Sequence, residues 1–306
     1  MRLSRHARRS GLLLLAATLC LRTLGDLGPL TARARMAFPN AMPQTVLWAW
    51  EEPEDLRTAD PAKLGVAYLA RTLLLGESRI TTLPRHQPLE VPDGMAVMAV
   101  VRIETEPGFR DSPTLRQQTA GALAEVSRQR GLHALQVDFD ATHSERTFYA
   151  AVLHQLRPQM PPAMPLSITA LASWCAADPT SGPQQNWLAG LPIDEAVPMF
   201  FRLGGHAKPY DDKTWIPIRQ PLCRGSIGIS TDESWPEVNP VARVYLFAPR
   251  PWFPDQLTAA ALLPESDRAG VLRQPNRGVG DLDSLSTVAV RARSDAPDPI
   301  RTEEER

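Results

Sequence analysis

The sequence predicts an α/β protein built as one (β/α)8 barrel of the TIM type. Two observations favour this fold. Eight short apolar runs recur along the chain with helical or irregular stretches between them, and the 306 residues suffice for the ~250 residues of such a barrel plus two tails. Residues 203–225 show no helical period and contain several glycines and prolines, so irregularity is expected around strands six and seven. We expect one barrel domain over 44–263.

The predicted strands are short apolar runs, several of them rich in β-branched residues. They span 46–50, 65–73, 97–103, 134–139, 166–172, 196–201, 226–230 and 242–247. A helix is predicted over 113–130, where Ser112 is a suitable N-cap and Pro113 suits the first helical position. Further helices are predicted over 145–157 and 255–262. From residue 264 the chain loses apolar density and period, so 264–306 is expected to be a disordered tail.

The first 35 residues are expected to be a signal peptide or an N-terminal anchor. Four arginines, at positions 2, 5, 8 and 9, precede the apolar run 11–21, which is a charged segment followed by a hydrophobic one of suitable length. The run is too short to span a bilayer. The alternative is that translation begins at Met36 or Met42. We therefore expect an exported protein, periplasmic or associated with the cell envelope, that meets a membrane only through this segment if it stays uncleaved.

Charge and cofactor signatures exclude several functions. Residues 36–306 hold 26 basic and 33 acidic side chains, and an acidic body argues against nucleic acid as a partner, because nucleic acid binding needs a basic face. The chain lacks the HExxH, paired CxxC, GxxxxGK[ST] and GxGxxG signatures. We therefore expect no metal and no cofactor.

Alternation along the strands predicts a cluster of acids at the barrel mouth. In the fourth strand, Leu135 and Val137 share the face toward the helices, while Gln136, Asp138 and Asp140 share the inward face. The seventh strand repeats the pattern and places Asp232 inward. Because active sites of such barrels lie at the carboxyl ends of the strands, we expect Asp138, Asp140 and Asp232 to converge there.

Other strand ends supply aromatic and charged side chains that suit sugar binding, since rings stack on pyranose faces and paired carboxyls supply acid, base or nucleophile. The predicted substrate-binding residues are Trp48, Trp50, Glu52, Arg102, Glu104, Gln136, Trp174, Arg202, Asp232 and Trp252. Asp140 and Asp138 are the predicted catalytic pair. Structural alternatives stay open: the two N-terminal tryptophans pack in the core or rim, Glu52 lies in a solvated loop, and Arg102 pairs with Glu104 or Asp138.

Two cysteines follow the N-terminal segment, and we expect them to stay unpaired. Cys175 follows the fifth strand at the carboxyl face, whereas Cys223 precedes the seventh strand near the opposite face. A disulfide needs Cα atoms within ~7 Å, which is less than the length of a barrel.

The strings VLWAWEEPEDL, VVRIET, LQVDFDA, LSITALASWC, DEAVPMFFRLG and GSIGISTDE resemble a bacterial family designated domain of unknown function 3142, over most of residues 44–250. More distantly, HALQVDFD is similar to the motif DGxDxDxE on the fourth strand of chitinase-like glycoside hydrolases. The resemblance puts Asp138 on the last Asp of that motif and Asp140 on its catalytic Glu. His133 and Gln136 replace the earlier acids, and Asp140 is one methylene shorter than Glu.

The sequence therefore predicts a barrel that acts on a polysaccharide or glycoconjugate as a glycoside hydrolase does, with Asp140 as the acid and Asp138 as its electrostatic partner or second carboxylate. One alternative is a barrel of the same shape that binds envelope glycan or a protein partner without chemistry. A structural envelope protein without a pocket is a third possibility.

Overall fold

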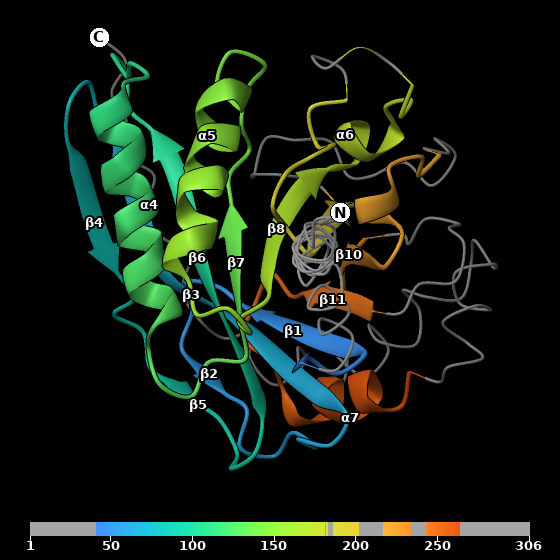
Figure 1. Ribbon diagram of the computed structural model, residues 1–306. Helices are drawn as coiled ribbons and strands as arrows, with labels where there is room; N and C mark the ends of the chain where they lie inside the picture. The colour runs from blue at the N-terminus through green and yellow to red at the C-terminus, as the bar shows by residue number, and fades with distance from the viewer. Residues whose placement is uncertain (1–40, 181, 183–185, 202–216, 234–242, 264–306) are drawn as a thin grey trace, which may run out of the picture. The chain divides into compact units, whose positions relative to one another are not determined.

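The computed structural model describes residues 41–180, 182, 186–201, 217–233 and 243–263. Within them, eight parallel strands pair in the order β1-β11-β10-β9-β8-β7-β6-β3, and β3 pairs with β1 to close the barrel (Figure 1). The strands are β1 (Thr45–Ala49), β3 (Leu64–Leu75), β6 (Ala96–Thr105), β7 (Ala134–Asp138), β8 (Leu166–Leu171), β9 (Glu195–Met199), β10 (Ser226–Ser230) and β11 (Arg243–Phe247). Each coincides with one predicted run, so the predicted barrel is confirmed. The predicted signal segment and tail lie outside the described residues.

The strand β3 is long enough to serve two partners. Its first residues, 64–68, pair with β1, and residues 71–75 pair with the antiparallel strand β4 (Ile80–Pro84). A register shift between Leu69 and Arg71 marks the change on the side that faces β6. Two further short strands, β2 (Glu54–Asp55) and β5 (Leu89–Glu90), form a separate parallel pair. The strands β2, β4 and β5 were not predicted from the sequence.

Helices cover the barrel unevenly. The helices α4 (Pro113–Ser127), α5 (Arg146–Leu156) and α7 (Pro254–Ala261) confirm the three predicted ones, and α6 (Ala172–Ala176) is a short helix after β8. The described links 50–63 and 76–95 contain no α-helix, so the strict alternation of strand and helix fails between β1 and β6. The β-branched run Ile80-Thr81-Thr82 favours a strand there.

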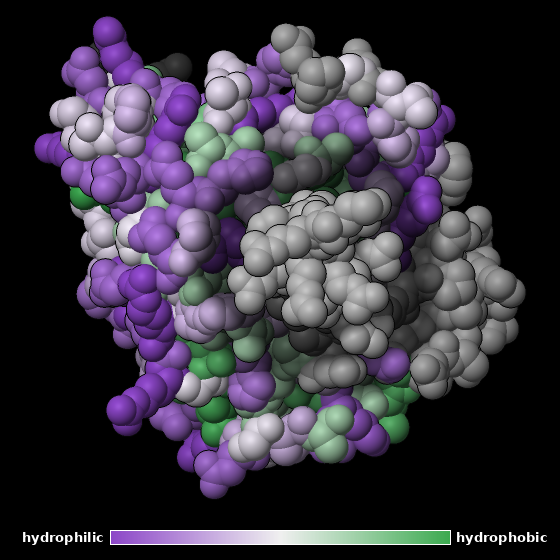
Figure 2. Space-filling model, in the orientation of Figure 1, coloured by the Kyte–Doolittle hydropathy of each residue, from purple (hydrophilic) through white to green (hydrophobic). Residues whose placement is uncertain are grey.

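The helix α4 forms as its sequence predicts. Leu115 donates its backbone N–H to Ser112 Oγ at 3.2 Å, and Pro113 occupies the first turn, where it costs no hydrogen bond. Leu115, Leu123 and Val126 are buried toward the barrel, and α4 packs beside α5 and against β6 and β7. The exposed surface over α4, at the left of the view, is mostly hydrophilic (Figure 2).

Two layers of apolar side chains hold the barrel. Leu135 and Val137 belong to an outer cluster between the strands and the helices α4 and α5. Inside the barrel, an inner cluster includes Trp48, Met98 and Tyr245. Alternate residues of β7 thus face opposite layers, as the pleat of a strand requires.

The two cysteines form a disulfide, so the expectation that they stay unpaired was wrong. The Cα atoms of Cys175 and Cys223 are 5.8 Å apart, although the barrel and its strand order are as predicted. Cys175 lies in α6, and Cys223 ends the 3-10 helix η3 (Pro221–Cys223) that precedes β10. Both elements pack on β9, and the backbone N–H groups of Arg219 and Gln220 both donate to the carbonyl of Cys175. The error arose because a short helix after a strand can fold back over the outside of the barrel.

Candidate functional site

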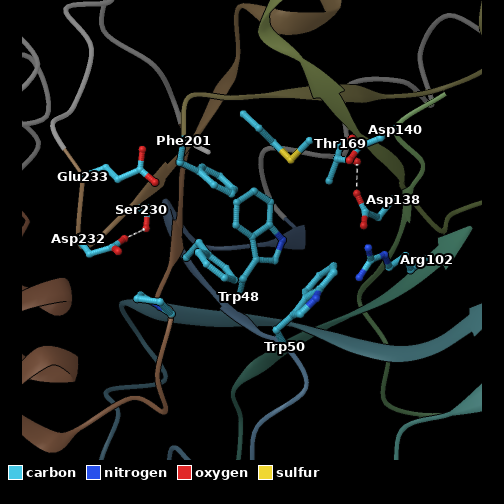
Figure 3. Close-up of a pocket in the computed structure, with 13 residues that line it drawn as sticks. Trp48, Trp50, Arg102, Asp138, Asp140, Thr169, Phe201, Ser230, Asp232 and Glu233 are labelled. Carbon is cyan, nitrogen blue, oxygen red and sulfur yellow. Dashed lines mark hydrogen bonds between the residues drawn. The ribbon is translucent and has the colours of Figure 1, made fainter. Parts of the chain in front are cut away.

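A cavity of about 500 Å³ lies at the carboxyl ends of the barrel strands, the end where such barrels carry their sites (Figure 3). Its lining combines acids, aromatic rings and one arginine among the described residues. The lining residues are Trp48, Trp50, Arg102, Asp138, Asp140, Thr169, Met199, Phe201, Ser230, Asp232, Glu233, Phe247 and Pro249.

One wall of the cavity carries the predicted catalytic pair. Asp138 is the last residue of β7 and is only 9% exposed, whereas Asp140, two residues later, is exposed to the cavity. Thr169 on β8 donates its hydroxyl proton to Asp138 Oδ1 at 2.6 Å. Figure 3 shows the bond between Thr169 and Asp138, with Arg102 next to Asp138 and Asp140 on the same wall of the cavity. The pair therefore consists of one enclosed and one accessible carboxyl group.

The surroundings favour the protonated form of both acids. Burial raises the pKa of Asp138 to about 6, and the neighbouring charge of Asp140 adds to the shift, while the bond from Thr169 and the charge of Arg102 oppose it. Partial burial by the cavity walls also raises the pKa of Asp140, again against Arg102. The charge of Asp140 therefore disfavours ionisation of Asp138.

Arg102 connects the acidic wall to the aromatic floor. It lies on β6 directly across from Asp138 in the strand register, and its guanidinium lies over the ring of Trp50, with its Cζ 5.9 Å from the ring centroid. Its Nη2 is 2.8 Å from Glu104 Oε1, so the alternative of an ion pair with Glu104 is the one that the structure shows. Glu104 itself does not line the cavity. Arg102 is thus a cation within the electrostatic reach of both acids.

Aromatic rings form the floor of the cavity. The indole of Trp48 stacks on Tyr245 at 5.2 Å between centroids and meets the edge of Phe201 at 5.9 Å, while Phe201 stacks on Phe247 at 5.3 Å. Gly228 on β10 makes room for this indole, because a Cβ there would lie 2.7 Å from Trp48 Cη2. The floor thus depends on the absence of a side chain at Gly228, two strands away from Trp48 in the barrel.

A second acidic wall faces the first across the aromatic rings. Ser230, at the end of β10, donates its hydroxyl proton to Asp232 Oδ1, and Glu233 follows in the chain. Figure 3 shows these three residues on the other side of Trp48 and Phe201 from Asp138 and Asp140. The alternation in the sequence had placed Asp232 in the mouth but had not singled out Glu233.

The two tryptophans predicted from later strand ends do not reach the cavity, and this corrects the sequence analysis. Trp174 lies in α6 and packs in the outer cluster, 4.8 Å from Trp187 between centroids. Trp252 is buried in another cluster outside the barrel, where its indole N–H donates to the carbonyl of Trp48 at 3.0 Å. Each tryptophan follows the end of its strand by several residues, and over that distance the chain turns away from the barrel mouth and packs against the outside of the barrel wall.

Two other predicted binding residues are placed elsewhere, and a third cannot be placed. Gln136 is fully buried beneath the floor, where its side chain bonds Trp48. Glu52 lies exposed in the loop after β1, and its carbonyl oxygen accepts a bond from Arg85 at 2.6 Å. Arg202 lies outside the described residues. The alternation along a strand predicts which face a side chain takes but not how deep in the barrel it lies. For this reason Gln136 was correctly expected to point inward but was wrongly expected to reach the cavity.

Several lining residues were missed by the sequence analysis. Thr169 could have been predicted from the alternation of β8, because it occupies an inward position beside Asp138. Met199 and Phe247 end β9 and β11, and Phe201 follows β9 by two residues. All three belong to apolar runs that resemble ordinary core, so nothing in their local pattern marks them as cavity lining. Among the described residues, no group of three or more His, Cys, Asp or Glu side chains is arranged to hold a metal ion.

The fold and the cavity define a parallel α/β barrel with an acidic and aromatic site at the carboxyl ends of its strands. The model of a family described as Domain of unknown function (DUF3142) matches residues 93–182, which confirms the resemblance over that segment. The segment runs from β6 to α6 and includes Arg102, Asp138 and Asp140. No curated protein sequence matches the chain.

Three solved structures are similar to the chain at low identity. A Streptomyces coelicolor protein described as chitinase A is 12% identical, with a TM-score of 0.43 over 63% of this chain and 76% of that one. A family GH18 chitinase from Chromobacterium violaceum is 12% identical, with a TM-score of 0.43 over 76% and 84%. The Bacillus cereus spore cortex-lytic enzyme SleL is 15% identical, with a TM-score of 0.40 over 62% of this chain and 51% of its own. No activity is carried over from them.

Proposed function

We propose that the protein binds a polysaccharide or glycoconjugate in the cavity and cleaves a glycosidic bond there. The observation that carries the proposal is the pairing of Asp138 and Asp140 at the end of one strand, facing an aromatic floor inside a cavity of about 500 Å³. Glycoside cleavage uses two carboxyl groups of different protonation, and apolar sugar faces stack on aromatic rings.

In this proposal Asp140 is the proton donor, because it is the accessible member of the pair. As the bond from the sugar carbon to the leaving oxygen breaks, the proton of Asp140 passes to that oxygen. A water molecule then adds to the sugar carbon and gives up one proton to the carboxylate pair, which restores the starting protonation. Asp138 lies enclosed beside it, and burial raises the pKa of both carboxyl groups, so the pair retains a proton at a pH where an isolated Asp would have lost it. Trp48 and Trp50 would stack on the sugar rings.

A screen of the full-length protein on a glycan array, followed by incubation of the bound glycans and analysis of the products, tests this function. We expect binding and release of shorter oligosaccharides. Binding without any cleavage would favour the alternative, a barrel that holds envelope glycan without chemistry. Failure to bind any glycan would contradict both and leave a protein partner or a structural role.

We also propose that the protein is exported to the periplasm or cell envelope. The arginine-rich start with its apolar run supports export, and so does the buried disulfide, because disulfides persist in oxidising compartments. No helix among the described residues has the length and apolar character needed to cross a membrane. Mass spectrometry of the protein from its native host should find the first residues removed and Cys175 linked to Cys223. Peptides that begin at Met1 in the soluble fraction, or free thiols after unfolding, would contradict this proposal.

A further inference from the structure

A chain of buried hydrogen bonds crosses the barrel interior one layer below the cavity. Trp48 on β1 donates its indole N–H to Gln136 Oε1 on β7 at 2.9 Å. Gln136 Nε2 donates to Ser167 Oγ on β8 at 3.1 Å, and Ser167 donates in turn to Glu195 Oε2 on β9 at 3.0 Å. Gln136 and Ser167 have no exposed surface. The floor of the cavity is thus connected by side chains to three other strands.

The far end of this chain is anchored by a buried ion pair. Arg243 on β11 places Nη1 2.8 Å from Glu195 Oε1, and it also donates to the carbonyl oxygens of Met42 and Pro43 at 3.1 and 3.0 Å. Tyr245 donates its hydroxyl proton to Glu195 Oε2 at 2.7 Å. Because Tyr245 also stacks on Trp48, the same network meets the indole twice, at its N–H edge and on its ring face.

Position 136 calls for an amide side chain on chemical grounds. The indole N–H needs an acceptor, and the Ser167 oxygen needs a donor because its own proton is committed to Glu195. An amide offers both in one group without adding a charge. Leaving either partner unsatisfied in this interior would cost free energy, since buried polar groups lose their water.

We propose that Gln136 is a positioning residue, which holds the indole of Trp48 in a fixed orientation so that the floor of the cavity is formed before a ligand arrives. Gln136 does not touch the ligand and acts only through Trp48. The inference rests on the proposed function in one respect, that Trp48 is the platform on which a sugar stacks. A floor fixed in advance costs less ordering entropy when the ligand binds.

The test compares Gln136→Met, which keeps the side-chain length and removes both hydrogen bonds, with the unchanged full-length protein. Hydrogen exchange of the Trp48 indole N–H is followed by NMR, and the binding of cellohexaose and chitohexaose is measured by calorimetry. We expect exchange to become about tenfold faster or more, and the affinity for whichever hexasaccharide binds to fall by about tenfold. Gln136→Glu keeps the acceptor and, when protonated, the donor, and should restore most of the protection and affinity at low pH.

Thr119→Val is the matched control, because it removes a buried hydrogen bond, to the carbonyl of Leu115 in α4, without touching the barrel interior. It should leave the Trp48 signal and the affinity unchanged. Should Gln136→Met fail to fold, Gln136→Asn, which draws the amide away from the indole, is measured in its place.

Unchanged exchange at Trp48 in the position-136 variants would overturn the inference and assign the indole's orientation to Gly228 and Tyr245 alone. A mobilised indole with unchanged affinity would overturn it as well. If neither hexasaccharide binds the unchanged protein, the proposed function is weakened, while the exchange measurement still decides whether Gln136 holds the indole.

Discussion

Asp138 and Asp140 are two residues apart on the chain yet lie in different surroundings. Asp138 is enclosed and bonded by Thr169, while Asp140 is open to the cavity. Burial disfavours the negative charge of these carboxyl groups, and Arg102 is the one cation among the described lining residues whose charge opposes that effect. Groups arranged in this way shift their pKa values through their neighbours, so removing one neighbour is a direct probe of the arrangement.

Replacing Arg102 by Gln should raise the pKa of Asp138 further above its present value of about 6, because the charge of Arg102 now opposes the shift. The charged and titratable groups that interact electrostatically with Asp138 are Asp140, Glu104, Arg102 and Tyr149. Carbon-13 NMR of the aspartate carboxyl groups measures the titration. Arg110→Gln, which removes an exposed arginine paired with Glu77, is the control and should change nothing. An unchanged or lowered pKa in Arg102→Gln would show that the guanidinium does not act on the pair.

The raised pKa of Asp138 also implies a cost to stability above pH 6. The folded protein holds this proton up to pH about 6, whereas the unfolded chain releases it near 3.8, so the contribution of this group to stability is fully present at low pH and is lost as pH rises through 6. Asp138→Asn should therefore stabilise the protein by roughly 1–3 kcal/mol at pH 7 to 8 and by nothing below pH 4. Urea unfolding at several pH values measures this. A variant that is destabilised at pH 8 would contradict the assignment.

At the scale of elements, the strand pattern was informative because apolar residues in a barrel strand recur with a period that the sequence displays. All eight strands and the inward position of Asp232 followed from it. The cap of α4 followed from the helix-start signal of Ser112 before Pro113. The hairpin from β3 to β4 was missed because the polar stretch 76–95 carries no clear period. The disulfide and Trp174 were misplaced for one reason, that α6 folds back over the barrel.

The close approach of the Trp48 indole to Gly228 on β10 makes the protein sensitive to a side chain at position 228. A methyl group there would lie 2.7 Å from the indole of Trp48, so Gly228→Ala should displace the ring and destabilise the protein by about 1–3 kcal/mol. Gly121→Ala in α4 is the matched control, since a Cβ there meets nothing within 4 Å, and it should stabilise by up to about 1 kcal/mol. Denaturant unfolding compares the two. Equal effects would show that the floor tolerates movement.

At the scale of the whole molecule, the described barrel brings residues from seven strands to one cavity. The order of the strands predicted which strand ends meet, but the depth of each side chain along the barrel axis depends on stagger between strands, which one sequence does not display. Gln136 and Asp138 illustrate this, because they share a face and yet lie in different layers. The acidic and aromatic character of the mouth was therefore predictable, and the depth of Gln136 beneath its floor was not.

Asp140 is proposed to donate a proton in glycoside cleavage, and Asp140→Asn tests this role. Turnover of the oligosaccharide identified by the glycan screen and the melting temperature are measured on the same preparation. The account predicts turnover reduced by ~100-fold or more, with glycan affinity and melting temperature nearly unchanged. A variant that melts much earlier, with residual activity in proportion to its folded fraction, would contradict it and make Asp140 a structural carboxylate.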